Sequence, residues 1–166
     1  MTKDVNNSEP SFQVDRFRCK DINEPNYLMF NECVKQLDAF KPNMFRLESH
    51  QKAWKCQFAN ENAQDAGGPY RESIEWMCQE IKDINRLPLF ILCPNGIDNI
   101  GKNRDKYVPN ALYCTNIHEK MYHFLGKLMG LAIRTGDLLN LNLAPIVWKK
   151  ILNDNIKPKD IISIEQ

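Results

Sequence analysis

Hydrophobic residues recur along this chain with two different spacings, one typical of strands and one of helices. Phe12 and Val14 alternate with polar neighbours, and the apolar residues of segment 54–58 do the same. Alternation places every second side chain on one face, so both segments are predicted to be half-buried strands. A third, buried strand is predicted at Leu89–Cys93, where residues 94–96 (Pro-Asn-Gly) provide a stop signal.

Four longer segments carry apolar residues at helical spacing. Because these helical patterns outweigh the three short alternating runs, the predicted fold class is α+β and predominantly helical. A further helix is expected to start at Pro158. The first helix is expected to open at Asn23 and to end before Lys41, and the second to begin at Pro69. The third is expected to run from near Asn116, a possible N-cap, to a C-cap at Gly136, and the fourth to begin at Pro145.

Composition and charge narrow the class of protein. The 166 residues fit one domain or subdomain, and 43% hydrophobic with 26% charged residues is ordinary for a globular chain. The 22 basic and 21 acidic residues form no basic stripe, so a nucleic-acid partner is not expected. Because the longest apolar run, Leu87–Cys93, is too short to cross a bilayer, no membrane segment is expected. Residues 1–10 contain no apolar core and are expected to form a disordered leader rather than a secretory signal.

The six cysteines are expected to be thiols, mostly buried. Three disulfides are arithmetically possible, but the chain shows neither a secretory signal nor a Cys-x-x-Cys pair. Unpaired cysteine commonly behaves as a small apolar residue. A reducing compartment, the cytosol or the nucleus, is therefore the expected location.

Candidate chemistry elsewhere in the chain is weak, so no cofactor and no metal are expected. Segment 96–103 resembles a phosphate-binding loop, but Asn103 replaces the hydroxyl that would hold magnesium, and no helix-opening run follows. Cys114, His118 and His123 could suggest a metal site, but histidines five apart diverge on a helix. The carboxylates show no paired arrangement. A small-ligand enzyme that uses this loop or the 65–73 segment stays open as an alternative.

Two glycine pairs point to structural constraints. Gly67 and Gly68 precede Pro69, which predicts a tight corner feeding a helix. Whichever of the two adopts a positive φ is expected not to tolerate a β-branched residue. Gly126 and Gly130 share one face of a predicted helix, where glycine costs roughly 1 kcal/mol against alanine, so close helix packing is the expected compensation.

Three segments in this order, 65–73, 124–136 and 141–150, resemble the N-lobe of HECT-type ubiquitin ligases, most closely the large HERC-like members. Other matching segments are Trp54-Lys55-Cys56, residues 87–90 followed by 94–96, and residues 103–107. The resemblance implies a large N-lobe subdomain over residues 11–155. It also implies that residues 156–166 begin the smaller subdomain that docks a ubiquitin-conjugating enzyme. The residues carried over as structural motif positions are Asp65, Gly67, Gly68, Pro69, Arg71, Gly126, Gly130, Arg134 and Trp148.

The reaction implied by the resemblance is transthiolation. Ubiquitin passes as a thioester from the conjugating enzyme to a ligase cysteine, and from there to a substrate lysine. In this family that cysteine belongs to a C-lobe, and none of the six cysteines stands where it would be. These 166 residues are therefore expected to act as an inactive scaffold, with apolar surface exposed on the helix from Pro145 and at Ile161 and Ile162. A non-catalytic adaptor derived from an N-lobe remains the alternative, and the resemblance names no substrate.

Overall fold

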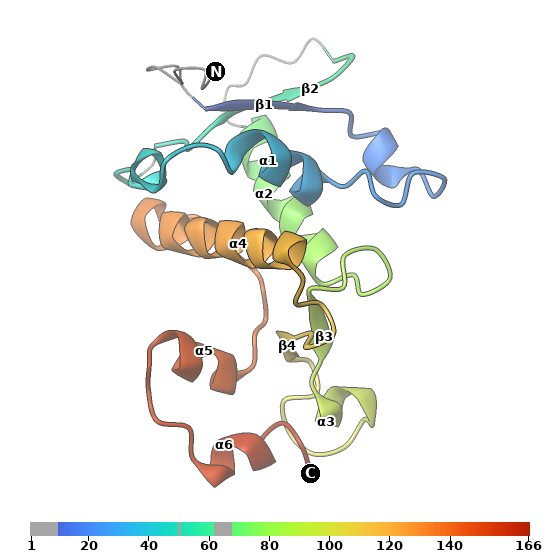
Figure 1. Ribbon diagram of the computed structural model, residues 1–166, viewed down its shortest axis with the longest axis vertical. Helices are drawn as coiled ribbons and strands as arrows, with labels where there is room; N and C mark the ends of the chain where they lie inside the picture. Colours follow the sequence, from blue (N-terminus) through green and yellow to red (C-terminus); the bar gives the residue numbers. More distant parts are fainter. Residues whose placement is uncertain (1–9, 50, 62–67) are drawn as a thin grey trace. The chain divides into compact units, whose positions relative to one another are not determined.

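The computed structural model describes residues 10–49, 51–61 and 68–166, and Figure 1 shows their path. The expected leader, apart from Pro10, and the motif residues Asp65 and Gly67 lie outside the described residues. The chain divides into a first unit, residues 1–80 with 115–139, and a second unit, residues 81–114 with 140–166. The fold is α+β and mostly helical with short strands, as predicted from the spacing.

Strands β1 (Ser11–Val14) and β2 (Lys55–Phe58) pair in parallel in the first unit. Phe12 lies opposite Cys56 and Val14 opposite Phe58, so all four buried residues share one face of the ribbon. Both strands were predicted from the alternation, and both are confirmed. A parallel pair needs a long crossover connection, and residues 15–54, which include helix α1 (Met29–Leu37), provide it.

The core of the first unit lies between α1 and helix α4 (Asn116–Thr135). Figure 1 shows α1 between the β1–β2 ribbon and α4. The ring of Phe124 on α4 meets Phe30 of α1 edge to face at 6.0 Å, and Phe45 at 6.3 Å. Phe45 belongs to the 3-10 helix η2 (Pro42–Phe45), and a shorter one, η1 (Arg18–Lys20), precedes α1. Edge-to-face contacts of this kind add to the stabilisation from burial alone.

Helix α1 begins at Met29, several residues after the predicted start at Asn23. The preceding segment forms turns instead, because the Asp21 carboxylate accepts the backbone N–H of Asn23 at 2.8 Å. The Tyr27 hydroxyl accepts the N–H of Asp15 at 3.0 Å, which fixes this segment against the end of β1. Local side-chain bonds to the backbone compete with helix formation in this way.

The second unit is built on the antiparallel strands β3 (Phe90–Leu92) and β4 (Tyr107–Pro109). The predicted strand at Leu89–Cys93 is confirmed, and its partner β4 is a three-residue strand that the pattern does not reveal. Tyr107 also bridges to Leu143, through the Tyr107 N–H to Asn142 O at 3.0 Å and the Ala144 N–H to Tyr107 O at 2.9 Å. The helices of this unit are α3 (Pro94–Ile97), α5 (Pro145–Ile151) and α6 (Pro158–Ile162).

Helix α2 (Gly68–Ile81) carries a buried carboxylate at its C-terminal end that caps the start of α1. Glu80 is 4% exposed. Its two oxygens accept the backbone N–H groups of Met29 at 2.9 Å and of Phe30 at 2.8 Å. The residue before α1, Leu28, offers no side-chain oxygen, so Glu80 satisfies donors that a local N-cap would otherwise satisfy. A negative charge at a helix N-terminus also favours the helix dipole.

No helix in the described residues is both long enough and apolar enough to span a bilayer.

Replacing Glu80 with alanine is expected to lower the free energy of unfolding by about 2–3 kcal/mol, because two buried N–H donors lose a charged acceptor. Glu75→Ala, an exposed glutamate on the same helix, is the matched control and should change stability by less than about 0.5 kcal/mol. Urea denaturation followed by circular dichroism measures both. Equal losses in the two variants would contradict the capping role.

Candidate functional site

Two of the sequence motifs meet in the first unit through a buried tyrosine. Tyr70 lies in the first turn of α2, and its hydroxyl donates to Asp137 Oδ2 at 3.2 Å, just beyond the C-terminus of α4. The Thr135 hydroxyl lies 2.9 Å from the same oxygen and 3.1 Å from Leu131 O. We call Tyr70, Thr135 and Asp137 the Tyr70 junction. It joins the segment that follows the glycine corner to the end of the 124–136 segment.

The environment of Tyr70 holds its hydroxyl in the neutral form. The residue is 3% exposed, and this burial, with the nearby Asp137 carboxylate, raises the pKa of the Tyr70 hydroxyl above its ordinary value. A neutral hydroxyl can donate to the carboxylate, whereas a phenolate would repel it. The Tyr70 hydroxyl therefore serves as a hydrogen-bond donor within the fold.

The first turn of α2 is also fixed on the residues that lead into β2. Trp54 is fully buried, and its ring lies 4.9 Å from the ring of Tyr70, between centroids. The Trp54 indole N–H donates to Ser73 Oγ at 3.3 Å, and the Ser73 hydroxyl donates to Tyr70 O at 2.6 Å. Trp54 belongs to the Trp54-Lys55-Cys56 motif. Side-chain contacts thus connect this motif to the start of α2, and the start of α2 to the end of α4.

Gly68 does not provide the predicted positive φ. It is the first residue of α2, it is exposed, and its φ lies outside the left-handed region. No heavy atom of the described chain lies within 4 Å of a Cβ built there. Gly68 has helical backbone at an open surface, which accepts a side chain. Gly67 lies outside the described residues, so the expectation that one glycine of the pair adopts a positive φ and rejects a β-branched residue stays a prediction. Pro69 follows in the first turn of the helix and Arg71 is exposed.

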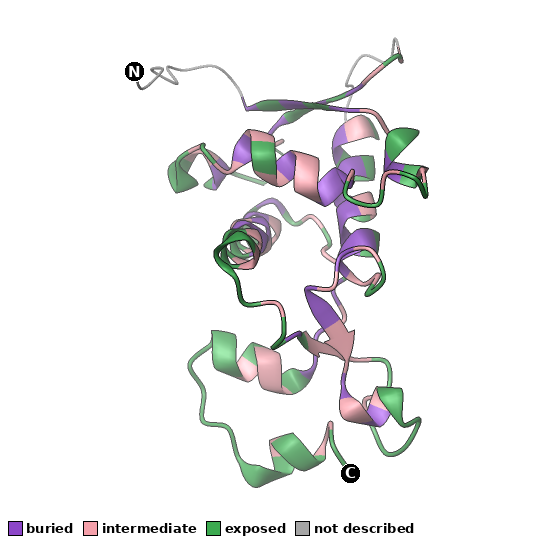
Figure 2. Cartoon of the chain, turned by 45° about the vertical axis from the view of Figure 1, so that its right-hand side comes forward, coloured by how far each residue is buried: buried purple, intermediate pink, exposed green. Residues whose placement is uncertain are grey.

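The glycines of α4 serve different purposes. Gly136 has φ 79° and closes the helix through its N–H to Ala132 O at 3.0 Å, as predicted. Gly126 and Gly130 are exposed, and no heavy atom of the described residues comes within 4 Å of a Cβ built at either. The expected close helix packing is therefore not seen at these glycines within the first unit, where one side of α4 is exposed and green in Figure 2. Arg134 donates through Nε to Leu47 O at 3.1 Å.

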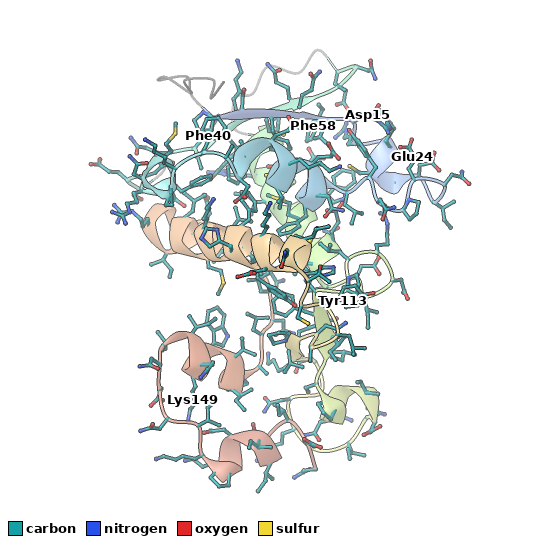
Figure 3. The ribbon with its side chains drawn as sticks, in the orientation of Figure 1. Asp15, Glu24, Phe40, Phe58, Tyr113 and Lys149 are labelled. Carbon is teal, nitrogen blue, oxygen red and sulfur yellow. The ribbon has the colours of Figure 1, made fainter. Side chains whose placement is uncertain are left out.

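Trp148 lies in the second unit, on α5, and is 42% exposed. The adjacent Lys149 reaches toward α6 (Figure 3), and its ammonium lies 2.8 Å from Asp160 Oδ2. This hydrogen bond lowers the pKa of Asp160 and raises the pKa of Lys149. The apolar surface predicted on α5 and α6 is confirmed at Ile151, Leu152, Ile161 and Ile162, which are exposed, whereas Ile146 and Val147 are half-buried.

Most of the cysteine thiols lie inside the fold, away from any substrate. Five cysteines are buried and only Cys114 is exposed; all six lie within the described residues and are thiols. Burial, with Cys56 and Glu80 nearby, raises the pKa of Cys33 well above its ordinary value, which is the opposite of what thiolate chemistry requires. His118 Nδ1 lies 2.8 Å from the Thr115 hydroxyl at the start of α4. Across the described residues, no three His, Cys, Asp or Glu side chains cluster as a metal site would require.

Comparison with known proteins identifies the class. Residues 75–166, more than half of the chain, match the HECT-domain (ubiquitin-transferase) family, and the chain belongs to this family. It is 37% identical over 138 residues, 83% of its length, to the E3 ubiquitin-protein ligase HERC2 of Mus musculus, and 36% identical over 138 residues to HERC2 of Homo sapiens. It is 33% identical over 107 residues, 64% of its length, to the probable E3 ubiquitin-protein ligase HECTD4 of Homo sapiens. The chain spans about 3% of the length of each of these curated relatives.

The two described glycines at element ends give a matched stability test. Gly136→Ala is expected to cost about 1 kcal/mol, because a Cβ disfavours the left-handed conformation that closes α4. Gly68→Ala should stay within about 0.5 kcal/mol of the parent. Thermal or urea denaturation measures both variants. A larger loss at Gly68 than at Gly136 would contradict this assignment.

Alkaline pH should weaken the Tyr70 junction. An unfolded tyrosine loses its proton near pH 10, whereas folded Tyr70 keeps it to higher pH, so its stabilisation is complete below pH 10 and declines above. Tyr70→Phe should cost about 1 kcal/mol at pH 7. Its stability should then fall less steeply than that of the parent between about pH 9 and about pH 11. Denaturation at several pH values measures the difference, and parallel curves would show that Tyr70 does not carry this dependence.

Proposed function

We propose that this chain is the scaffold part of a HECT-type ubiquitin-protein ligase. The parent protein would accept ubiquitin as a thioester from a conjugating enzyme and transfer it to substrate lysines. The observation that carries the proposal is membership of the ubiquitin-transferase family, supported by relatives that are named E3 ubiquitin-protein ligases. In this reading residues 11–155 are the large N-lobe subdomain, and residues 156–166 begin the subdomain that docks the conjugating enzyme.

The motif residues have a structural role in this proposal. Contacts among Trp54, Tyr70 and Asp137 hold the segment before β2, the start of α2 and the end of α4 together. A lobe that positions two other parts of a ligase needs internal support of this kind. The partners are a ubiquitin-conjugating enzyme, ubiquitin, and the C-lobe and small subdomain of the same protein. A reducing compartment, cytosol or nucleus, fits the six thiols.

The ubiquitin-accepting cysteine is proposed to lie in the C-lobe and not among these 166 residues. A transthiolation acceptor must be accessible and must ionise readily. Burial denies access to Cys19, Cys33, Cys56, Cys78 and Cys93. Cys114 is exposed, but in the described part of the chain no hydrogen-bonded histidine or basic side chain accompanies it.

The 166-residue chain is expected to form no thioester with ubiquitin. The assay incubates it with activating enzyme, a panel of conjugating enzymes and ubiquitin, and compares gels with and without reductant. The conjugating enzymes' own thioesters serve as the positive control. A reductant-sensitive adduct that disappears in Cys114→Ser would contradict the scaffold role.

The same assay separates the ligase from the adaptor alternative when it is run on the longest natural protein that contains residues 1–166. A reductant-sensitive ubiquitin adduct on that protein supports the ligase. Its absence under conditions that charge the conjugating enzymes supports the adaptor.

A further inference from the structure

The segment that follows α6 lies against the loop that follows β3, within the second unit. The Asn95 backbone N–H donates to Ile164 O at 2.9 Å, and the Gln166 N–H donates back to Asn95 Oδ1 at 2.8 Å. Asn103 adds a third bond, from Nδ2 to Ser163 O at 3.0 Å. Asn95 is fully buried, and its Nδ2 also donates to Lys102 O at 2.9 Å. Residues 95–103 therefore donate hydrogen bonds to carbonyl groups of this segment and accept one from its backbone N–H.

The fit is too close for a larger residue at one position of the loop. Gly101 has φ +63°, and a Cβ built on it would lie 2.3 Å from Gln166 Oε1 and 2.8 Å from Asn95 Nδ2. The positive φ strongly favours glycine there, and a Cβ would also force the Gln166 and Asn95 side chains to shift. Asn103 also has a positive φ, of 57°, which asparagine adopts more readily than most residues.

A fourth bond joins Asn95 Nδ2 to Ser163 O at 3.4 Å. All four bonds between residues 95–103 and the segment end on backbone atoms of the segment, so they fix the direction of the chain whatever its side chains are. Helix α6 is attached separately to α5 through Lys149 and Asp160. If the four bonds opened, α6 would stay tethered at that ion pair while the chain after it moved. One attachment within a short helix and one directly after it make a hinge with a latch.

We propose that loop 95–103 is a conformational clasp that holds residues 163–166 and sets the direction in which the chain leaves α6. Resting on the function proposed above, the clasp would orient the docking subdomain that begins at residue 156. Opening the clasp would let the part of that subdomain that follows α6 turn about this helix without unfolding β3 and β4. The buried Asn95 makes the closed state the favoured one, since an unpaired buried amide is costly.

The test is amide hydrogen exchange by NMR on the 166-residue chain carrying Asn103→Asp. This substitution keeps the size of the side chain and removes its donor to Ser163 O. Exchange of the Asn95 amide, which donates to Ile164 O, should accelerate roughly fivefold or more, as expected when a bond that holds a locally opening segment is lost. The amides of Cys93 and Asn110, which donate to Lys106 O and Leu89 O beside the β3–β4 pair, should keep the exchange rates of the parent and show that the unit stays folded.

Asn153→Asp is the matched control. Asn153 is exposed, lies in the same unit and has φ 55°, so the substitution makes the same charge change in the same backbone conformation. In the Asn153→Asp variant, the Asn95 amide should exchange at the same rate as in the parent chain. An unchanged Asn95 amide in Asn103→Asp, or an equal acceleration in both variants, would overturn the clasp.

A second pair of variants tests the close contact independently. Gly101→Ala should accelerate Asn95 exchange, and adding Gln166→Gly should restore part of the protection, because the shortest clash is with the Gln166 side chain. Strictly additive effects would contradict the contact. None of these measurements involves ubiquitin, so a failed clasp and a failed ligase assignment would be told apart.

Discussion

The first unit depends on a carboxylate that is buried at the start of a helix. A buried charge is tolerated only when its hydrogen-bonding capacity is met, and Glu80 meets it with the N–H groups of Met29 and Phe30. The two bonds hold the first turn of α1, and the same turn presents Phe30 to Phe124 of α4. The polar contact and the apolar core thus meet at the same end of α1.

Glu80 lies near one end of α2, and Tyr70 lies near the other. Tyr70 reaches Asp137 after α4, while Glu80 reaches the start of α1, so α2 is fixed to two helices by polar side chains at its two ends. Fully satisfied buried hydrogen bonds rigidify a core and specify one arrangement of it. Rigidity of this kind suits a lobe whose proposed task is to position other parts.

Periodicity predicted the strands β1, β2 and β3, the helix α4 and its closure at Gly136, because each signal is local. It failed for the start of α1, because the cap that decides it comes from Glu80, about fifty residues along the chain. β4 was missed because three residues ending in Pro109 are too short for alternation to register. The shared helix face of Gly126 and Gly130 predicted close packing, but only the spatial arrangement shows that both are exposed.

The resemblance to the family was carried by the order of the motifs along the chain, which composition does not contain.

The same distinction between local signal and spatial surroundings applies to the cysteines. A residue type indicates reactivity only when its surroundings lower the cost of the reactive form, and the surroundings of Cys33 raise the pKa of that thiol. Five buried polar residues of the described chain form hydrogen bonds to backbone or to other side chains: Ser73, Glu80, Asn95, Asn110 and Thr135. These bonds fix helices and loops in place, and this is the property that the proposed scaffold role requires.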